Sequence, residues 1–320
     1  MSMEYAVSLL FFLLSLLLAP LLPGIINRVK ALTAGRQGRP VLQLYYDIAK
    51  LMRKSPVYPH VSSFFFRAAP VAGVVAGVAA LALVPFGLVR PLVSFPGDFI
   101  LMGGLFALSR YSLILGALDT GSAFEGMGAA REALFSALAE PIFLFTLMLV
   151  GYQAFQYSLA GMLGAVDSSV WQSSWPFYLM AVLALFLLLL PENCRIPVDD
   201  PNTHLELTMI HEVMILDHSG PDLALLEYAS ALKLWIFSLL IAGLLLPGPG
   251  WAVFGAAGVG GSGGTGVLLA AFLTLLLVFL VAIMVGVVES LMARLRLERV
   301  PQILALAGSF ACLAALSLWS

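Results

Sequence analysis

The sequence predicts an all-α, polytopic membrane protein of about eight transmembrane helices. Of its 320 residues, 61% are hydrophobic and 11% are charged, and the mean hydropathy is +1.01, which lies far outside the range of soluble domains. The apolar residues also form runs long enough to cross the hydrocarbon core of a bilayer. These runs lie near residues 5–26, 68–89, 99–118, 133–152, 175–191, 229–246, 265–288 and 300–319. We therefore expect a single transmembrane domain over residues 1–320. The first run is expected to remain as a permanent helix, because it is too long for a signal peptide and lacks a basic n-region.

Basic residues are distributed unevenly among the predicted loops. Eight of the 16 lysines and arginines, from Arg28 to Arg67, lie between the first two runs or at their edges. The positive-inside rule places that loop in the cytoplasm. Alternation of sides then predicts cytoplasmic loops at about 27–67, 119–132, 192–228 and 289–299. We expect a multi-pass protein of the cell inner (cytoplasmic) membrane with both termini outside.

The first cytoplasmic loop contains an amphipathic segment, "VLQLYYDIAKLMRK" (41–54). Its apolar residues follow the spacing of one helical stripe, so it predicts a short helix lying in the membrane interface. A surface helix packed against protein is the alternative. Basic residues of this loop are candidates for contact with anionic membrane lipid or with a docked protein: Arg36, Arg39, Arg53 and Lys54.

Titratable residues gather in the loop from Pro191 to Asp222, which holds seven of the 18 carboxylates and three of the four histidines. Asp200 followed by Pro201 predicts a helix that starts there and continues to about Leu216. On that helix His204 and His211 share a face, and His218 follows at the same seven-residue interval. This interval separates the side chains by about 10 Å along the axis, which is too far for one metal ion. A solvated acidic loop is the alternative to a functional cluster.

Two charged residues fall inside predicted spans, where charges are costly and usually face a bundle interior or a water cavity. They are Arg110 and Glu140. Glu132, Ser136 and Glu140 follow at four-residue intervals and cover roughly 12 Å of helix, which suits a proton or ion path. A purely structural pairing with Arg110 is the alternative. Glu289 and Lys233, at the inner ends of their spans, are expected to complete an inward-facing ring or to reach the interface.

The two cysteines, Cys194 and Cys312, are too few for an iron–sulfur cluster or a structural zinc site. We identify no catalytic nucleophile, resident cofactor or metal site, and we expect no nucleic-acid partner. Any electron transfer therefore belongs to partner subunits.

Several segments together resemble a family of complex I membrane subunits, the NADH dehydrogenase subunit 1-like family, and especially its hydrogenase branch in energy-converting [NiFe] hydrogenases and formate hydrogenlyases. The carrying segments are "GRQGRPVLQLYYDIAKLMRKSPVYP", "ALSRYSLILGALDTGSAFEGMGAAREALFSALAEP", "ENCRIPVDDPNTHLEL", "HSGPDLALLEYASALK" and "ESLMARLRL". The resemblance implies a membrane subunit that docks a cytoplasmic electron-transfer module and couples redox chemistry to proton or sodium translocation. Implied partners are soluble hydrogenase-like large and small subunits, an iron–sulfur subunit and antiporter-like membrane subunits, with Fe–S clusters and a [NiFe] site in those partners. The residues that we expect in coupling or in the ion path are Arg110, Glu132, Glu140, Glu192, Asp199, His204, Glu206, His211 and Glu289.

The sequence departs from the family pattern in the loop between the fifth and sixth runs. The family's "PFD" is "PVD" here, two of its usual acidic positions are Asn202 and His204, and its "RRGP" turn has become "RQGRP". These changes fall in the coupling loop and at the quinone entrance of complex I, so binding of a quinone stays open. A quinone-reactive complex I subunit and an autonomous secondary transporter remain the rival interpretations.

Overall fold

The computed structural model describes residues 2–166, 168–199, 209–246 and 264–318. Within these ranges the chain is helical and contains no β-strand apart from an isolated bridge between Phe86 and Val89. Seven helices are long and apolar enough to cross a membrane, the last of them together with the short η1 (Leu297–Arg299) that precedes it. They are α4 (Phe64–Leu81), α5 (Asp98–Asp119), α6 (Ala123–Ala154), α9 (Trp175–Glu192), α11 (Gly220–Leu245), α13 (Gly264–Leu291) and α14 (Val300–Ser317). The predicted all-α polytopic architecture is confirmed.

The first predicted span is broken into two helices, α1 (Ser2–Leu18) and α2 (Leu21–Thr33), which meet at 43° and give an eighth span if counted together. Pro20 causes the break because it has no N–H to donate to the carbonyl of Leu16. The Tyr228 hydroxyl donates to that carbonyl at 2.9 Å, and the Tyr45 hydroxyl donates to the carbonyl of Leu17 at 2.5 Å. Backbone groups left without partners in an apolar medium cost several kcal/mol each, so the two tyrosines stabilise the bend.

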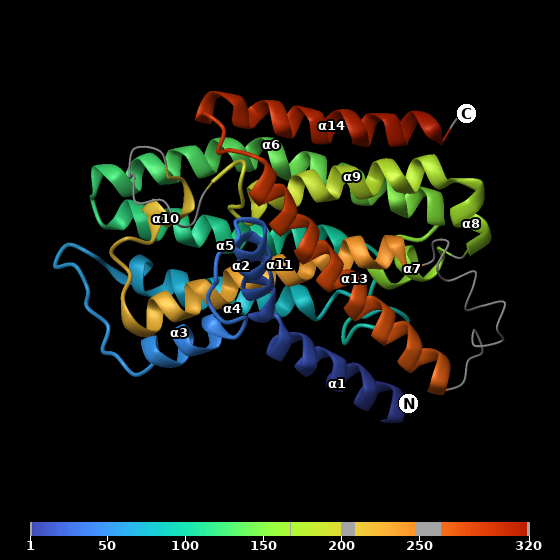
Figure 1. Cartoon of the computed structure of the whole chain (residues 1–320), viewed down its shortest axis with the longest axis horizontal. Coiled ribbons are helices and arrows are strands. Elements are labelled where there is room, and N and C mark those ends of the chain that lie inside the picture. Colours follow the sequence, from blue (N-terminus) through green and yellow to red (C-terminus); the bar gives the residue numbers. More distant parts are fainter. Residues whose placement is uncertain (1, 167, 200–208, 247–263, 319–320) are drawn as a thin grey trace.

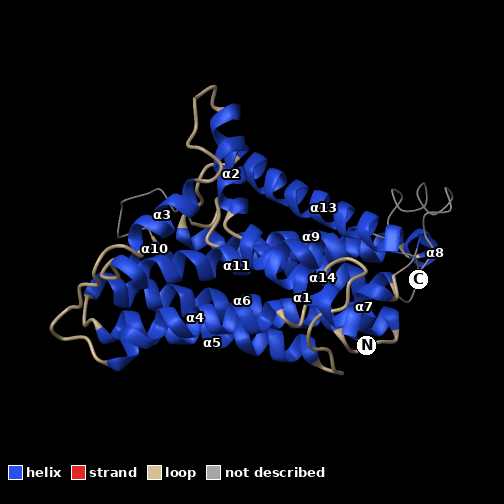
Figure 2. Ribbon diagram, turned by 90° about the horizontal axis from the view of Figure 1, so that it is seen from below, coloured by secondary structure: helices blue, strands red, loops and turns tan. Residues whose placement is uncertain are grey.

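Figure 1 shows α4, α5, α6, α9, α11 and α14 running side by side along the long axis, with α1 and α13 at a slant to them. Both chain termini lie at one end of the bundle, while α3 (Gln43–Leu51) and α10 (His211–Met214) lie at the other. The short helices α7 (Leu159–Gly164) and α8 (Ser168–Ser173) lie at the end that carries the termini. Figure 2 shows α2 and the adjacent part of α13 projecting from the side of the bundle.

The centre of the bundle is α11, the most buried of the candidate spans. Its Trp235 and Phe237 are fully buried, and the Phe237 ring lies 5.6 Å from that of Phe106 and 5.2 Å from that of Phe143. These aromatic contacts join α11 to α5 and α6, the two helices that carry the predicted intramembrane charges.

The α10 segment packs directly on α6 because of a glycine. A Cβ atom at Gly128 would lie 2.3 Å from the Val213 side chain and 2.9 Å from the carbonyl oxygen of Ile210. No larger residue at this position leaves room for that approach. Gly128 thus places the polar loop before α11 against the cytoplasmic end predicted for the fourth span.

The predicted helix from Pro201 to Leu216 is wrong in the part that the structure describes. Residues 201–208, with His204 and Glu206, lie outside the described residues, whereas Met209 and Ile210 are not helical and α10 has only four residues. Backbone groups of this segment form hydrogen bonds with side chains rather than with a preceding turn of helix. The Asp199 carboxylate accepts from the N–H groups of Ile210 and His211 at 3.0 and 3.1 Å, and Arg131 donates to the Met209 carbonyl at 2.7 Å.

His218 lies beyond the end of α10. It is buried and stacks on Phe66 of α4 with ring centroids 3.9 Å apart. Burial lowers its pKa to about 4. His218 is therefore neutral near pH 7 and acts as part of the packing between this loop and α4.

Candidate functional site

Arg110 of α5 lies among three carboxylates from two other helices. Its Nη1 bonds Glu140 of α6, its Nη2 lies 2.6 Å from Glu192 of α9, and its Nε lies 3.2 Å from Glu132 of α6. The Arg110 and Glu192 side chains are 6% and 7% exposed, while that of Glu140 is 38% exposed. Charged residues up to 82 positions apart in the sequence therefore lie together at one buried point.

A second cation joins this group. Lys233 of α11 places its Nζ 2.7 Å from the same Glu192 oxygen that Arg110 binds. We call these five residues, Arg110, Lys233, Glu132, Glu140 and Glu192, the Arg110 cluster. With all five ionised the cluster would hold two positive and three negative charges, and an excess charge is costly where water is scarce. Among the described residues, the cluster therefore combines three carboxylates with two basic side chains.

A separate group lies where the loop after α9 meets α2 and the segment after α13. Glu289 at the end of α13 lies 2.8 Å from Lys30 of α2 and 3.8 Å from Arg195. Asp199 lies 3.0 Å from Arg294 and accepts the two backbone bonds described above. We call this group of Lys30, Asp199, Arg195, Glu289 and Arg294 the Asp199–Glu289 cluster. The loop segment 192–199 contributes residues to both clusters.

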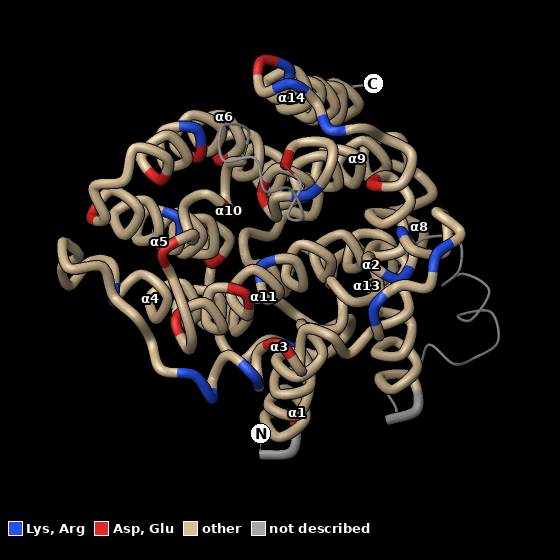
Figure 3. The backbone as a smooth tube through the Cα atoms, turned by 60° about the vertical axis from the view of Figure 1, so that its left-hand side comes forward, with Lys and Arg blue, Asp and Glu red and all other residues tan. Residues whose placement is uncertain are grey.

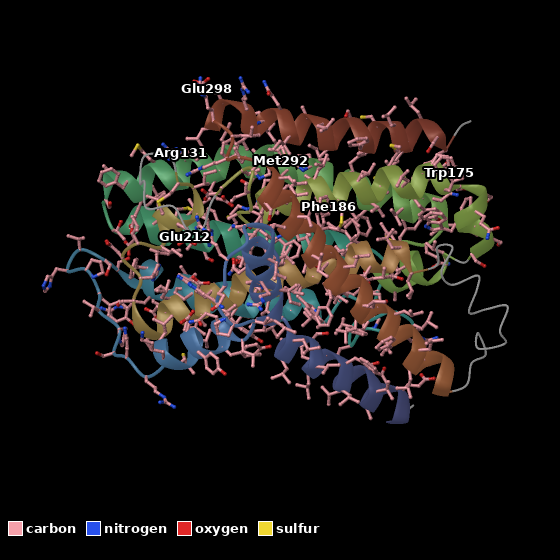
Figure 4. The ribbon with its side chains drawn as sticks, in the orientation of Figure 1. Arg131, Trp175, Phe186, Glu212, Met292 and Glu298 are labelled. Atoms are coloured by element: carbon pink, nitrogen blue, oxygen red, sulfur yellow. The ribbon has the colours of Figure 1, made fainter. Side chains whose placement is uncertain are left out.

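A polar cavity of about 400 Å³ opens next to these clusters. Its walls come from α2, the segment Arg39–Lys54, the loop residues 193–195, α10 and α11. Burial, together with the charges of Glu227 and Asp199, raises the pKa of Glu212 to about 7. Burial also lowers the pKa of His211, which lines the same cavity. Figure 4 labels Glu212, on α10, at this end of the bundle, and Trp175 at the opposite end.

Two smaller cavities lie between this space and the face formed by α5 and α6 and share lining residues with each other. One of about 60 Å³ shares Asn193 and His211 with the polar cavity and reaches Arg110 and Lys233. Another of about 210 Å³ shares Arg110 and Glu192 with the first and is otherwise lined mainly by apolar residues of α5 and α6. The Arg110 cluster thus lies between a polar cavity at the α3/α10 end and an apolar recess on the side of the bundle.

The structure brings together four of the predicted site residues, Arg110, Glu132, Glu140 and Glu192, and places Asp199 and Glu289 in the second cluster. His211 lines the polar cavity, as do two of the basic residues predicted for docking, Arg39 and Lys54. Arg36 and Arg53 are exposed at the same end. Figure 3, with that end brought forward, shows acidic and basic residues around and between the helix ends there.

Sequence reasoning missed several residues of these sites. Glu212, Glu227, Asn193 and Arg195 all line the polar cavity, and Lys30 binds Glu289. The charge of Arg195 next to Glu192 and the position of Glu227 inside a long apolar helix were available signals. Among the described residues, no three histidine, cysteine or acidic side chains lie close enough to hold one metal ion. The predicted absence of a metal in the whole chain stays a prediction.

Fold and site together define a polytopic, all-α membrane protein with a buried network of ionisable side chains. The family described as NADH dehydrogenase matches residues 5–318, and the chain belongs to that family.

Two relatives from Escherichia coli (strain K12) align with almost the entire chain. Formate hydrogenlyase subunit 4 is 31% identical over 303 residues, covering 94% of each chain, and hydrogenase-4 component C is 32% identical over 302 residues, covering 93% of this chain and 91% of its own. A subunit of the NADH-quinone oxidoreductase of Burkholderia vietnamiensis is 26% identical over 217 residues, which is 65% of this chain and 60% of that protein.

The fold is also similar to a chain in the structure of the membrane-bound sulfane sulfur reductase, an archaeal respiratory membrane complex. The TM-score is 0.78 at 18% sequence identity, and the match covers 98% of both chains. The predicted resemblance to the NADH dehydrogenase subunit 1-like family of complex I, with its hydrogenase branch, is confirmed by the family and sequence matches.

Proposed function

We propose that this chain is the membrane subunit of an energy-converting oxidoreductase complex of the hydrogenase type and couples its redox chemistry to translocation of protons or sodium ions. The observation that carries the proposal is the convergence of Glu132, Glu140 and Glu192 on the buried Arg110. Structural neutralisation of one arginine needs one carboxylate, whereas three carboxylates with only two cations provide a site that can gain and release a proton.

The path proposed for the ion begins in the polar cavity at the α3/α10 end. It continues past His211 and Lys233 to the Arg110 cluster and leaves through the recess beside Glu140. The half-exposed Glu140 side chain lies at the outer end of this sequence. An antiporter-like membrane subunit packed against α5 and α6 would continue the path.

The loop segment 192–199 is the element that would transmit a redox-driven rearrangement. It carries Glu192 in the Arg110 cluster and Arg195 and Asp199 in the second cluster. A movement of this segment changes the distances of Glu192 to its two cations, and a carboxylate loses or gains a proton when its charged neighbours move. Coupling roles are also predicted for His204, Glu206 and His211, which follow this segment in the predicted cytoplasmic loop 192–228.

The partners proposed are a soluble module of hydrogenase-like large and small subunits with an iron–sulfur subunit, which would hold the Fe–S clusters and a [NiFe] site. The two Escherichia coli relatives, a formate hydrogenlyase subunit and a hydrogenase-4 component, support this class of complex. The exposed basic residues at the α3/α10 end would face that module, with this end in the cytoplasm and both termini outside. Arg36→Glu with Arg53→Glu should reduce co-purification of the soluble subunits without reducing membrane insertion.

The direct test replaces Glu140 by Gln in the assembled complex reconstituted into proteoliposomes. We expect the complex to assemble and to turn over with artificial electron carriers, but to lose redox-driven ion uptake. Glu298→Gln, at an exposed carboxylate before α14, is the matched control and should pump normally. Normal pumping by the Glu140→Gln complex would remove Glu140 from the path.

A quinone-reactive subunit is the second candidate. It is favoured by the polar cavity, where Arg195 and His211 could donate hydrogen bonds to a carbonyl group, and by the NADH-quinone oxidoreductase relative. Retention of a quinone by the purified complex would support this candidate.

A further inference from the structure

Charged residues of both signs line the polar cavity and differ in exposure. Its rim carries three exposed cations, Arg39, Lys50 and Lys54. Glu212 and Glu227 lie further in and are only partly exposed. Asp47 is also partly exposed, and the buried Arg195 adds a cation to the inner wall. A ligand with a negative group beside the rim cations and a positive group beside the two glutamates matches most of these charges.

The inner wall has hydrogen-bonding groups without partners. Asn193 is 5% exposed and its Oδ1 atom is buried without a hydrogen bond, as is the Nε atom of Arg195, which is 7% exposed. Within the described part of the chain, neither Glu212 nor Glu227 forms an ion pair. The Oδ1 atom of Asn193 has almost no exposed surface, so the acceptors that the cavity presents are the two partly exposed carboxyl groups.

We propose that this cavity binds the headgroup of a phospholipid with a primary ammonium group, of the phosphatidylethanolamine class. The ammonium group has three N–H donors, two of which match Glu212 and Glu227. The phosphate, which lies between the ammonium group and the acyl chains, would meet the cations of the rim. The acyl chains would leave along the apolar side of α3, whose Leu44, Ile48 and Leu51 line the cavity.

Other ligand classes match this lining less well. A quinone ring offers only carbonyl acceptors, so it would pair with Arg195 or with protonated Glu212 but would bring no cation to the two glutamates. A lipid whose headgroup is wholly anionic or neutral would bring no cation to them. A bare metal ion lacks three close side-chain ligands among the described residues. The proposal concerns a bound lipid and does not depend on ion translocation.

The test uses the purified complex, delipidated in detergent and then given one lipid at a time. Dioleoyl phosphatidylethanolamine and dioleoyl phosphatidylcholine share acyl chains and phosphate, but the trimethylammonium group of the second has no N–H to donate. Native mass spectrometry should show one tightly held phosphatidylethanolamine per chain, with retention of phosphatidylcholine weaker by about tenfold or more, as expected for loss of charge-assisted hydrogen bonds. Equal retention of the two lipids, or tighter retention of dioleoyl phosphatidylglycerol, would overturn the proposal.

Soluble phosphoethanolamine separates a lipid site from a site for a free zwitterion. We expect it to bind far more weakly than the lipid, because it lacks the acyl chains that contact α3. Binding as tight as that of the lipid would overturn the assignment to a lipid.

Matched variants locate the site. Glu227→Gln should abolish the preference for phosphatidylethanolamine, whereas Asp222→Asn, at a carboxylate on the same helix outside the cavity lining, should keep it. Lys54→Gln should weaken retention of both lipids through the phosphate, and Arg28→Gln, at an exposed arginine outside the lining, should not. Because Lys54 is exposed, its replacement should not impair folding, so Lys54→Gln can still test the site if Glu227→Gln fails to fold. A preference that survives both Glu227→Gln and Lys54→Gln would contradict the proposal.

Discussion

The Arg110 cluster and the Asp199–Glu289 cluster lie at the two ends of the same loop segment but differ in charge balance. Among the residues that the structure describes, the first has three carboxylates for two cations, and the second has two carboxylates for three cations. On the proposed function, the Arg110 cluster exchanges a proton and the Asp199–Glu289 cluster holds the loop in place. The difference in charge between the two clusters is what this proposal rests on.

The two clusters also differ in the exposure of their side chains and in the cavities beside them. Cavities reach the Arg110 cluster from two sides, and its Glu140 is 38% exposed. In the second cluster the side chain of Glu289 is 0% exposed and that of Asp199 is 1% exposed, and Asp199 also accepts two backbone hydrogen bonds. These two hydrogen bonds hold the start of α10 against the part of the loop that contains Asp199.

The largest effect is expected from removing the cation shared by the first cluster. Arg110→Leu would leave Glu132 and Glu140 without their cation and Glu192 with Lys233 alone, and breaking a buried pair in this way costs about 3–5 kcal/mol. We expect loss of the assembled complex, measured as its yield by size-exclusion chromatography. Arg90→Leu, at an exposed arginine, should give the normal yield. Full assembly of the Arg110→Leu complex would show that the cluster contributes little to stability.

A smaller effect separates the two clusters directly. Glu289→Gln removes the carboxylate between Lys30 and Arg195, so two cations lose their partner and the thermal midpoint should fall by several degrees. Glu140→Gln removes one of three carboxylates around Arg110, where Glu132 and Glu192 remain, and should lower the midpoint much less. Equal losses in the two variants would mean that the charge balance of the clusters does not distinguish them.

The smallest effect concerns the pH dependence of stability. Because the pKa of Glu212 is raised to about 7, the folded protein keeps a proton that the unfolded chain releases above its ordinary pKa of about 4.5. This contribution is complete below pH 4.5 and is lost as the pH rises through 7; a shift of this size corresponds to about 3 kcal/mol at most.

Glu212→Gln should therefore reduce the fall in thermal midpoint between pH 5 and pH 8. The comparison of variant with parent at each pH isolates Glu212 from other groups, including His218, whose lowered pKa acts with the opposite sign as the pH falls below 6.5. Identical profiles of variant and parent would show that Glu212 titrates normally.

Much of this architecture could be predicted from the sequence because a bilayer constrains it strongly. Apolar runs gave the long helices, and the cost of a charge in hydrocarbon singled out Arg110 and Glu140. The spacing of Glu132 and Glu140 placed both on one face of α6. The convergence of Glu192 and Lys233 on the same point depends on how α5, α9 and α11 pack, which spacing along one helix does not encode.

The errors have local physical causes. A predicted helix through Met209 and Ile210 failed because the side chains of Asp199 and Arg131 take the backbone groups that a helix would use. The break in the first span was not predicted, although Pro20 within the apolar run was a signal for it. The tyrosines that stabilise the bend come from distant segments and could not be paired with it from sequence.

The most direct test of the central claim is infrared difference spectroscopy of the assembled complex near neutral pH. A protonated carboxyl group absorbs apart from a carboxylate, so a retained proton in the Arg110 cluster gives a distinct carbonyl band. We expect such a band in the parent protein, its loss or shift when Glu132, Glu140 or Glu192 is replaced by Gln, and no change in Glu289→Gln. A parent protein without this band, or a band that only Glu289→Gln removes, would contradict the assignment of the exchangeable proton to the Arg110 cluster.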